Sequence, residues 1–113
     1  MSATADHIRE QQRTIWDQFS AGWRKWDAEM LHWHAPFGDA LIGEARLRPD
    51  SIVLDVAAGT GEPGLTVAGL VPQGSVTLTD ISAGMLVVAE EKARARGLDN
   101  VHTVVRRCRP AVR

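Results

Sequence analysis

Apolar residues in the first 47 positions recur at steps of three, four and seven, which is the spacing of one helix face. The pattern predicts a helix over residues 8–31 and a second helix over residues 36–47. Pro36 suits the first turn of the second helix, where no backbone N–H partner is needed. The apolar positions of the first helix are Ile8, Ile15, Phe19, Trp23, Trp26 and Met30.

After residue 50 the period changes. Residues 51–56 form a short, nearly continuous aliphatic run, which is typical of a strand buried on both faces of a parallel sheet. A glycine-rich loop follows and leads into a helix from Leu65 to Val71. Residues 75–79 predict a second strand, which is closed by Asp80.

Ser82 is placed to cap the N-terminus of a further helix that runs to Arg96, and Gly97 stands where a helix stop is expected. Residues 101–105 predict a third strand. Alternating strands and helices predict an α/β protein with a Rossmann-like doubly wound sheet, of which this chain carries the first two to three strands. We therefore divide the chain into an N-terminal helical cap (1–48), the N-terminal part of a nucleotide-binding domain (49–105) and a basic tail (106–113).

Composition narrows the functional classes. The chain of 113 residues fits one small domain or part of a larger one, and no apolar run approaches the roughly 18 residues of a membrane span. With no secretion signal and a single cysteine, Cys108, we expect a cytoplasmic protein without an internal disulfide. Residues 1–100 carry nine basic and fourteen acidic residues, a net charge of −5, which does not favour a nucleic-acid partner.

The loop over residues 55–64 carries the candidate chemistry, because open parallel sheets bind nucleotides between a strand and the following helix. Gly59, Gly61 and Gly64 match the dinucleotide fingerprint, a weak signal by itself. Asp80 ends the next strand nineteen residues after Gly61, a spacing at which a carboxylate accepts hydrogen bonds from a ribose. A glycine turn that serves only tight packing is the alternative.

The charge of Asp55 separates two nucleotide classes. If its carboxylate faces the loop, the pyrophosphate of NAD at about 4 Å would be repelled by roughly 1 to 4 kcal/mol. The ammonium group of S-adenosylmethionine (SAM) would instead be attracted. The sign of the charge therefore favours SAM, and NAD remains the alternative cofactor.

Two segments carry a resemblance to a known family. Residues 53–61 (Val-Leu-Asp-Val-Ala-Ala-Gly-Thr-Gly) look like motif I of class I SAM-dependent methyltransferases, and residues 79–86 (Thr-Asp-Ile-Ser-Ala-Gly-Met-Leu) resemble the next motif of the ubiquinone/menaquinone-biosynthesis branch. Many class I enzymes have glycine where this chain has Ala57, but alanine is common in this branch. The cofactor contacts that the resemblance implies come from Asp55, Ala57, Gly59, Thr60 and Gly61 around the methionyl group, Asp80 at the ribose, and Ile81 and Met85 at the adenine.

The resemblance implies a methyltransferase that acts on a small-molecule acceptor such as a quinone precursor. An NAD-binding oxidoreductase and an inactive methyltransferase fragment are the alternatives. No residue is identified as the catalytic base. The tryptophans Trp16, Trp23, Trp26 and Trp33 line a lid over the acceptor or pack in the core. His32 and His34 form a potential metal pair, but a catalytic zinc needs three protein ligands, so no metal is expected.

The basic tail differs in composition from the rest of the chain. A one-base shift of suitable codons turns residues 106–113 into Gly-Asp-Ala-Asp-Leu-Pro-Phe, and the resemblance implies a Gly-Asp-Ala segment at this point. We therefore hypothesise a frameshift after about residue 105. A tail for nucleic acid or anionic membrane, or an ordinary surface end, are the alternatives. With so few strands, we expect the isolated chain to be prone to aggregation.

Overall fold

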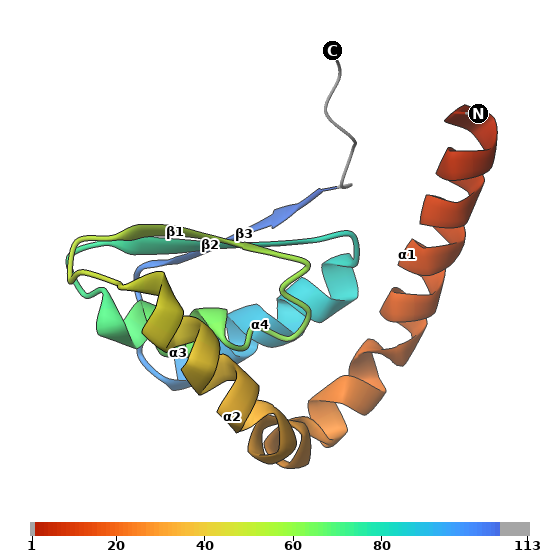
Figure 1. The fold of residues 1–113 in the computed structure, drawn as a ribbon. Coiled ribbons are helices and arrows are strands. Elements are labelled where there is room, and N and C mark those ends of the chain that lie inside the picture. The colour runs from red at the N-terminus through yellow and green to blue at the C-terminus, as the bar shows by residue number, and fades with distance from the viewer. Residues whose placement is uncertain (1, 107–113) are drawn as a thin grey trace.

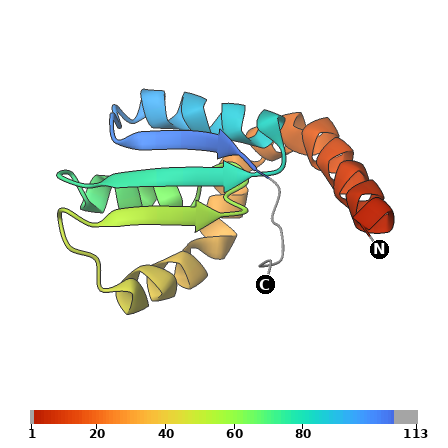
Figure 2. The same cartoon turned by 90° about the horizontal axis from the view of Figure 1, so that it is seen from above.

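The centre of the molecule is a three-stranded parallel sheet. The computed structural model describes residues 2–106, in which β1 (Ile52–Val56), β2 (Ser75–Asp80) and β3 (Val101–Val105) pair in the order β1-β2-β3 (Figure 2). Val56 lies opposite Thr79, and Asp80 lies opposite Val105. The carboxyl ends of all three strands therefore meet at one edge, and the predicted α/β class with parallel strands is confirmed.

Two helices, α3 (Gly64–Leu70) and α4 (Ala83–Ala95), cover one face of this sheet (Figure 1). Alternate strand residues point toward these helices, so Val76 and Leu78 are fully buried against Leu65. Complete burial of an aliphatic side chain contributes about 1.5–3 kcal/mol to the free energy of unfolding. The core that positions the site therefore lies between the sheet and these two helices.

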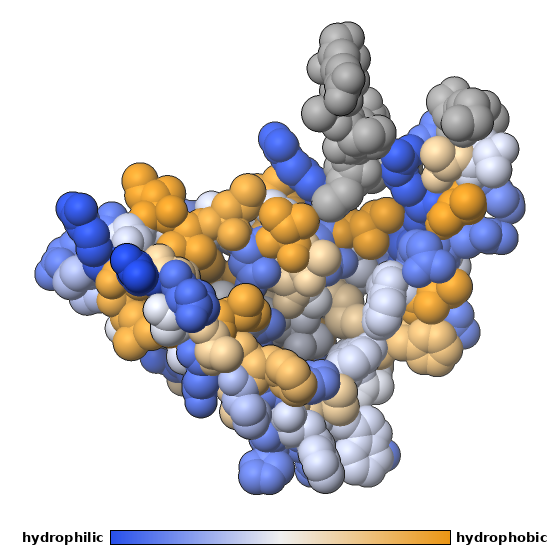
Figure 3. Space-filling view, in the orientation of Figure 1, coloured by the Kyte–Doolittle hydropathy of each residue, from blue (hydrophilic) through white to orange (hydrophobic). Residues whose placement is uncertain are grey.

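The opposite face of the sheet is uncovered in the described part of the chain. Ile52, Leu54 and Val56 of β1 are 86%, 65% and 53% exposed. Apolar side chains gather along the upper surface in Figure 3, above the strands. The predicted burial on both faces is therefore wrong for β1 within residues 2–106, where only the helix-facing side is covered.

The N-terminal segment forms two helices, α1 (Ser2–Lys25) and α2 (Asp27–Ala45). The break falls at Trp26, whose φ of −100° and ψ of 14° end the helical geometry, and not near residue 31 as predicted. Pro36 lies inside α2 and not in its first turn, although it removes one backbone hydrogen bond there. The apolar periodicity continues across the break, and for this reason the pattern alone placed the boundary too late.

The other element boundaries follow the sequence closely. Ser82 caps α4, since its Oγ accepts a hydrogen bond from the Met85 amide at 3.1 Å. Gly97 adopts a φ of 69°, the left-handed conformation that a helix stop requires. Of the predicted tail, Arg106 continues β3 by donating its amide to the Asp80 carbonyl at 2.9 Å. Residues 107–113, on which the frameshift hypothesis depends, lie outside the described residues.

Between residues 2 and 106, no helix is both long enough and apolar enough to cross a bilayer.

Candidate functional site

The loop between β1 and α3 turns sharply because three of its residues have positive φ angles. These angles are 58° at Ala57, 57° at Gly59 and 112° at Gly61. Alanine pays a steric cost in this region that glycine does not, so Ala57 is held there by its surroundings. The neighbouring Ala58 amide donates to the Thr79 carbonyl at 2.9 Å, which fixes the loop to the end of β2.

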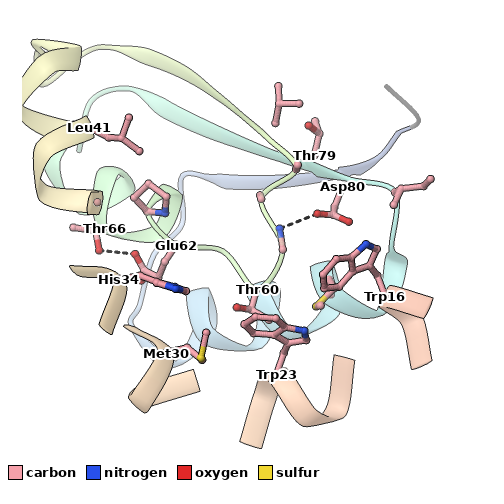
Figure 4. A pocket seen from close by; sticks show the side chains of 18 of the residues that line it. Trp16, Trp23, Met30, His34, Leu41, Thr60, Glu62, Thr66, Thr79 and Asp80 are labelled. Carbon is pink, nitrogen blue, oxygen red and sulfur yellow. Dashed lines mark hydrogen bonds between the residues drawn. The ribbon is translucent and has the colours of Figure 1, made fainter. Parts of the chain in front are cut away.

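Asp80 makes the second connection between this loop and β2. Its Oδ2 accepts a hydrogen bond from the Gly59 amide at 2.8 Å (Figure 4). Its Oδ1 accepts a second one from the Ser82 amide at 2.9 Å. A carboxylate has about four acceptor positions. The two bonds to the main chain therefore leave Asp80 with acceptor capacity for two further donors.

Asp55 points in a different direction from the one that the sequence argument assumed. It shares the helix-facing side of the sheet, and its Oδ2 is buried without a hydrogen-bond partner among the described residues. Burial raises its pKa to about 6, the Gly64 amide opposes the shift, and the Asp80 and Glu62 carboxylates add to it. The Asp55 carboxylate thus lies beneath the loop, and its charge does not select between NAD and SAM in the way predicted.

A cavity of about 1160 Å³ opens over the carboxyl ends of β1 and β2. Gly61 does not line this cavity, because the side-chain position of this residue points into the core. A Cβ at Gly61 would lie 2.8 Å from Leu65 Cδ1 and 3.1 Å from Ala89 Cβ. Asp55 is also absent from the lining. The six predicted site residues that do line the cavity are Ala57, Gly59, Thr60, Asp80, Ile81 and Met85.

Helices α1 and α2 supply the outer wall of the cavity. Trp16 and Trp23 face it from α1, with ring centroids 6.2 Å apart and ring planes at 44° (Figure 4). Trp26 and Trp33 do not line it. Within residues 4–106 no tryptophan is buried, so these side chains do not form a core. The apolar and imidazole side chains on α2 that face the cavity include Met30, His34 and Leu41.

Lys92 joins three segments at the floor of the site. Its Nζ donates to the Thr60 carbonyl at 2.9 Å and to Asp27 Oδ1 at 2.8 Å, so α4 holds both the loop and the start of α2. The Lys92 side chain is only 14% exposed, which strengthens this ion pair relative to a surface one. The sequence analysis missed both residues, since nothing in a local pattern connects positions 65 apart.

The positions of the two histidines on α2 do not support a metal site. His32 and His34 are both exposed on α2, and only His34 faces the cavity. Among residues 2–106, no three His, Cys, Asp or Glu side chains are grouped so as to hold a metal ion.

The donor and acceptor groups around Gly59 fit a nucleoside. A Cβ at Gly59 would meet no atom within 4 Å, so the space in front of this residue is open. Asp80 has spare acceptor capacity for the two hydroxyl groups of a ribose, and Ile81 and Met85 present apolar surface to the same cavity. At about 1160 Å³, the cavity is slightly larger than ligand sites of the usual size, roughly 300–1000 Å³, and has room for a nucleoside.

Comparison with known proteins gives consistent similarities. Residues 53–111 match the protein-family model described as "Methyltransferase domain". The ribosomal RNA small subunit methyltransferase G of Porphyromonas gingivalis is 34% identical over 111 residues, covering 87% of this chain and 49% of that protein. The demethylmenaquinone methyltransferase of Symbiobacterium thermophilum is 36% identical over 92 residues, covering 80% of this chain and 32% of that protein.

The solved structures lead to the same group of proteins. A complex of DhpI with S-adenosylhomocysteine (SAH) has a TM-score of 0.62 and 27% identity, covering 87% of this chain and 44% of that one. Coclaurine N-methyltransferase bound to N-methylheliamine and SAH has a TM-score of 0.60 and 28% identity, covering 63% and 21%. The chain thus spans half or less of the length of the relatives it matches.

Proposed function

This chain belongs to the class I SAM-dependent methyltransferase family, in the branch similar to ubiquinone/menaquinone-biosynthesis enzymes, and from that premise we propose that it binds SAM and serves methyl transfer to a small apolar acceptor. The matched relatives are at least about twice as long as the residues aligned to them. The proposal therefore concerns the part of the binding site that residues 2–106 form.

The environment of Asp80 carries the proposal. Its carboxylate is fixed by the amides of Gly59 and Ser82 and retains two acceptor positions toward the cavity. A ribose needs a paired acceptor of this kind, and the adenine needs apolar surface such as that of Ile81 and Met85. The assigned roles are ribose binding for Asp80, adenine contact for Ile81 and Met85, and backbone approach for Ala57, Gly59 and Thr60.

The charge of the cavity wall supports SAM over a dinucleotide. Four carboxylates line the cavity, and two of them, Asp27 and Glu62, are neutralised by ion pairs with Lys92 and Arg96. Asp39 and Asp80 form no ion pair among the described residues and outnumber Arg106, since Arg9 pairs with Asp6. A pyrophosphate would meet this predominantly acidic lining unfavourably, whereas a sulfonium or ammonium cation would be favoured. This argument replaces the one based on Asp55, whose carboxylate lies beneath the loop.

When bound, SAM supplies an electrophilic methyl group. The chain's own contribution is orientation, since the hydrogen bonds of Asp80 hold the loop and β2 in a fixed relation before the cofactor arrives. Trp16, Trp23 and Met30 also give one side of the cavity an apolar wall. Exclusion of water favours a reaction in which a sulfonium charge disappears.

The outer wall favours a small apolar acceptor over RNA. Trp16, Trp23, Met30 and Leu41 offer aromatic and aliphatic surface. An RNA acceptor, which is what the printed name of the P. gingivalis relative indicates for that protein, calls for a basic surface that binds phosphates. Residues 1–100 have a net charge of −5, which disfavours such a surface.

The test is a calorimetric titration of the chain with SAM, SAH and NAD in parallel, followed by a methyl-transfer assay with labelled SAM and a set of phenolic and quinol acceptors. We expect binding of SAM and SAH and no binding of NAD. Binding of NAD with no response to SAH would contradict the assignment of the cofactor. Labelling of RNA and not of the small acceptors would contradict the assignment of the acceptor.

A further inference from the structure

A carboxylate from α1 reaches into the start of α4, next to the site. Asp17 Oδ1 accepts hydrogen bonds from Ser82 Oγ at 2.5 Å and from the Gly84 amide at 3.0 Å. The other oxygen, Oδ2, accepts from Arg13 at 2.8 Å. A negative charge at this end of α4 is favoured by the helix dipole and by the free amides of the first turn.

Ser82 connects this carboxylate to the cofactor-binding residues. The side chain of Ser82 is fully buried, so its hydroxyl depends on Asp17 as an acceptor. The same oxygen accepts from the Met85 amide at 3.1 Å, and the Ser82 backbone amide donates to Asp80 Oδ1 at 2.9 Å. Both residues that Ser82 holds, Asp80 and Met85, line the cavity.

The helix that supplies Asp17 also supplies part of the cavity's outer wall. Trp16 is adjacent to Asp17 in sequence, and Trp23 lies less than two turns further along α1. The helices approach closely here, since a Cβ at Gly84 would lie 2.9 Å from Ser20 Oγ and 3.2 Å from Asp17 Oδ1. One short stretch of α1 thus carries both the aromatic residues that line the cavity and the carboxylate that binds the start of α4.

A second polar contact between α1 and α4 allows a comparison. Arg24 and Glu91 pair at 3.0 Å, and their side chains are 51% and 48% exposed. An exposed pair of this kind contributes about 0–1 kcal/mol. It joins the same two helices but touches neither Ser82 nor the cavity, which makes it a matched control.

We propose that Asp17 is a positioning residue that couples the seating of α1 over the cavity to the cofactor-binding geometry of Asp80, through the buried hydroxyl and backbone of Ser82. The inference rests on the proposed function, because it assigns the coupling to the SAM site. Coupling between two sites is reciprocal. Binding of the cofactor therefore stabilises α1 in its docked position, and loss of the Asp17 contact weakens cofactor binding.

The test compares the unaltered chain with Asp17→Ala, which removes the acceptor of the Ser82 and Gly84 hydrogen bonds, and with Arg24→Gln. Two properties are measured, the affinity for SAH by calorimetry and the hydrogen exchange of α1 amides with and without SAH. In the unaltered chain, we expect SAH to slow exchange in α1. In Asp17→Ala, we expect at least about tenfold weaker SAH binding, which corresponds to at least about 1.4 kcal/mol. We also expect that SAH does not slow exchange in α1 of this variant. Arg24→Gln is expected to keep both properties.

The outcomes separate the two proposals. If Asp17→Ala binds SAH as tightly as the unaltered chain and SAH still protects α1, the coupling is refuted while the cofactor assignment stands. If the unaltered chain does not bind SAH, the proposed function fails and the coupling fails with it. Should Asp17→Ala lose its circular dichroism signal, Gly84→Ala decides, because its new Cβ crowds Ser20 and Asp17 on α1 without removing a charge, and faster exchange of the α1 amides shows that the contact is loosened. Unchanged SAH affinity in folded Gly84→Ala refutes the coupling.

Discussion

The Asp80 carboxylate holds the Gly59 amide at 2.8 Å across 21 positions of sequence, so the end of β2 and the turn after β1 form one rigid unit. Replacement of Asp80 by Asn removes the charge and one acceptor. We expect the affinity for SAH to fall at least about tenfold, since hydrogen bonds to charged groups contribute about 1.5–3 kcal/mol. Calorimetry measures this change. Asp99→Asn, an exposed position away from the cavity, is the control and should leave the affinity unchanged.

Gly64 is expected to be intolerant of any side chain. A Cβ there would lie 2.4 Å from Leu78 Cδ2 and 2.7 Å from Asp55 Oδ2, both in the packed interior. We expect Gly64→Ala to lower the free energy of unfolding by about 1–3 kcal/mol, as measured by urea titration. Gly69→Ala, in the same helix with no atom within 4 Å of its Cβ, should instead be neutral or stabilising by up to about 1 kcal/mol. Equal effects of the two changes would contradict the packing argument.

The raised pKa of Asp55 predicts a stability that depends on pH. Its folded-state pKa of about 6 exceeds the ordinary 3.8, so the folded chain binds the proton more tightly than the unfolded chain. The contribution of Asp55 to the free energy of unfolding is therefore largest below about pH 4 and falls by about 1–2 kcal/mol as the pH rises from about 4 through 6, after allowance for partial exposure. Asp55→Asn should remove this contribution and stabilise the protein at pH 8, in thermal melts across this range. If the stability of Asp55→Asn depends on pH in the same way as that of the unaltered chain, the raised pKa of Asp55 is not the cause of this dependence.

The outer wall of the cavity makes a separate prediction about the acceptor. Trp23→Ala removes an aromatic face from the cavity but leaves the Asp80 contacts in place. We expect a loss of about threefold to tenfold in the affinity for an apolar phenolic acceptor, with the SAH affinity unchanged. Quenching of tryptophan fluorescence provides the measurement. Trp33→Ala is the matched control, because Trp33 is 73% exposed and does not line the cavity.

The uncovered face of β1 predicts self-association. Leu54 is 65% exposed on a strand whose apolar side chains form a continuous surface with Ile52 and Val56. Leu54→Thr keeps the β-propensity of the strand but shortens this surface, so we expect less light scattering and weaker binding of a hydrophobic dye. Val87→Thr, an exposed change on α4, should have a smaller effect. If both changes reduce light scattering and dye binding equally, the exposed apolar side of β1 does not drive self-association.

Sequence patterns predicted the second half of the described chain better than the first. The caps at Ser82 and Gly97 and the strand over residues 101–105 depend on local chemistry, which a sequence displays directly. The break at Trp26 does not, because the apolar period passes through it unchanged. Local sequence rules therefore predicted the helix ends that have a capping residue. They misplaced the helix break at Trp26, which has none.

The site residues also divide into those that local sequence predicts and those that depend on tertiary packing. Ala57, Gly59 and Asp80 were found because motif spacing determines where a strand end and the next turn lie. The side of the sheet on which Asp55 points depends on the strand register, and the sequence argument assumed the wrong side. Asp17 lies 65 positions from Ser82, and its role arises only from the packing of α1 on α4. Long-range polar contacts of this kind leave no local pattern.

The two walls of the cavity come from separate stretches of the chain. Residues 57–85 supply the wall assigned to the cofactor, while helices α1 and α2 supply the other. The described contacts between these stretches include a few polar anchors, among them Asp17 and Lys92. Apart from Asp27, which contacts Lys92 and Thr60, positions on the cavity face of α2 can therefore change without disturbing the turn at Gly59. Acceptor preference and cofactor use can then diverge independently in evolution, and grafting foreign helices onto these anchors offers a route to redesigned acceptor specificity.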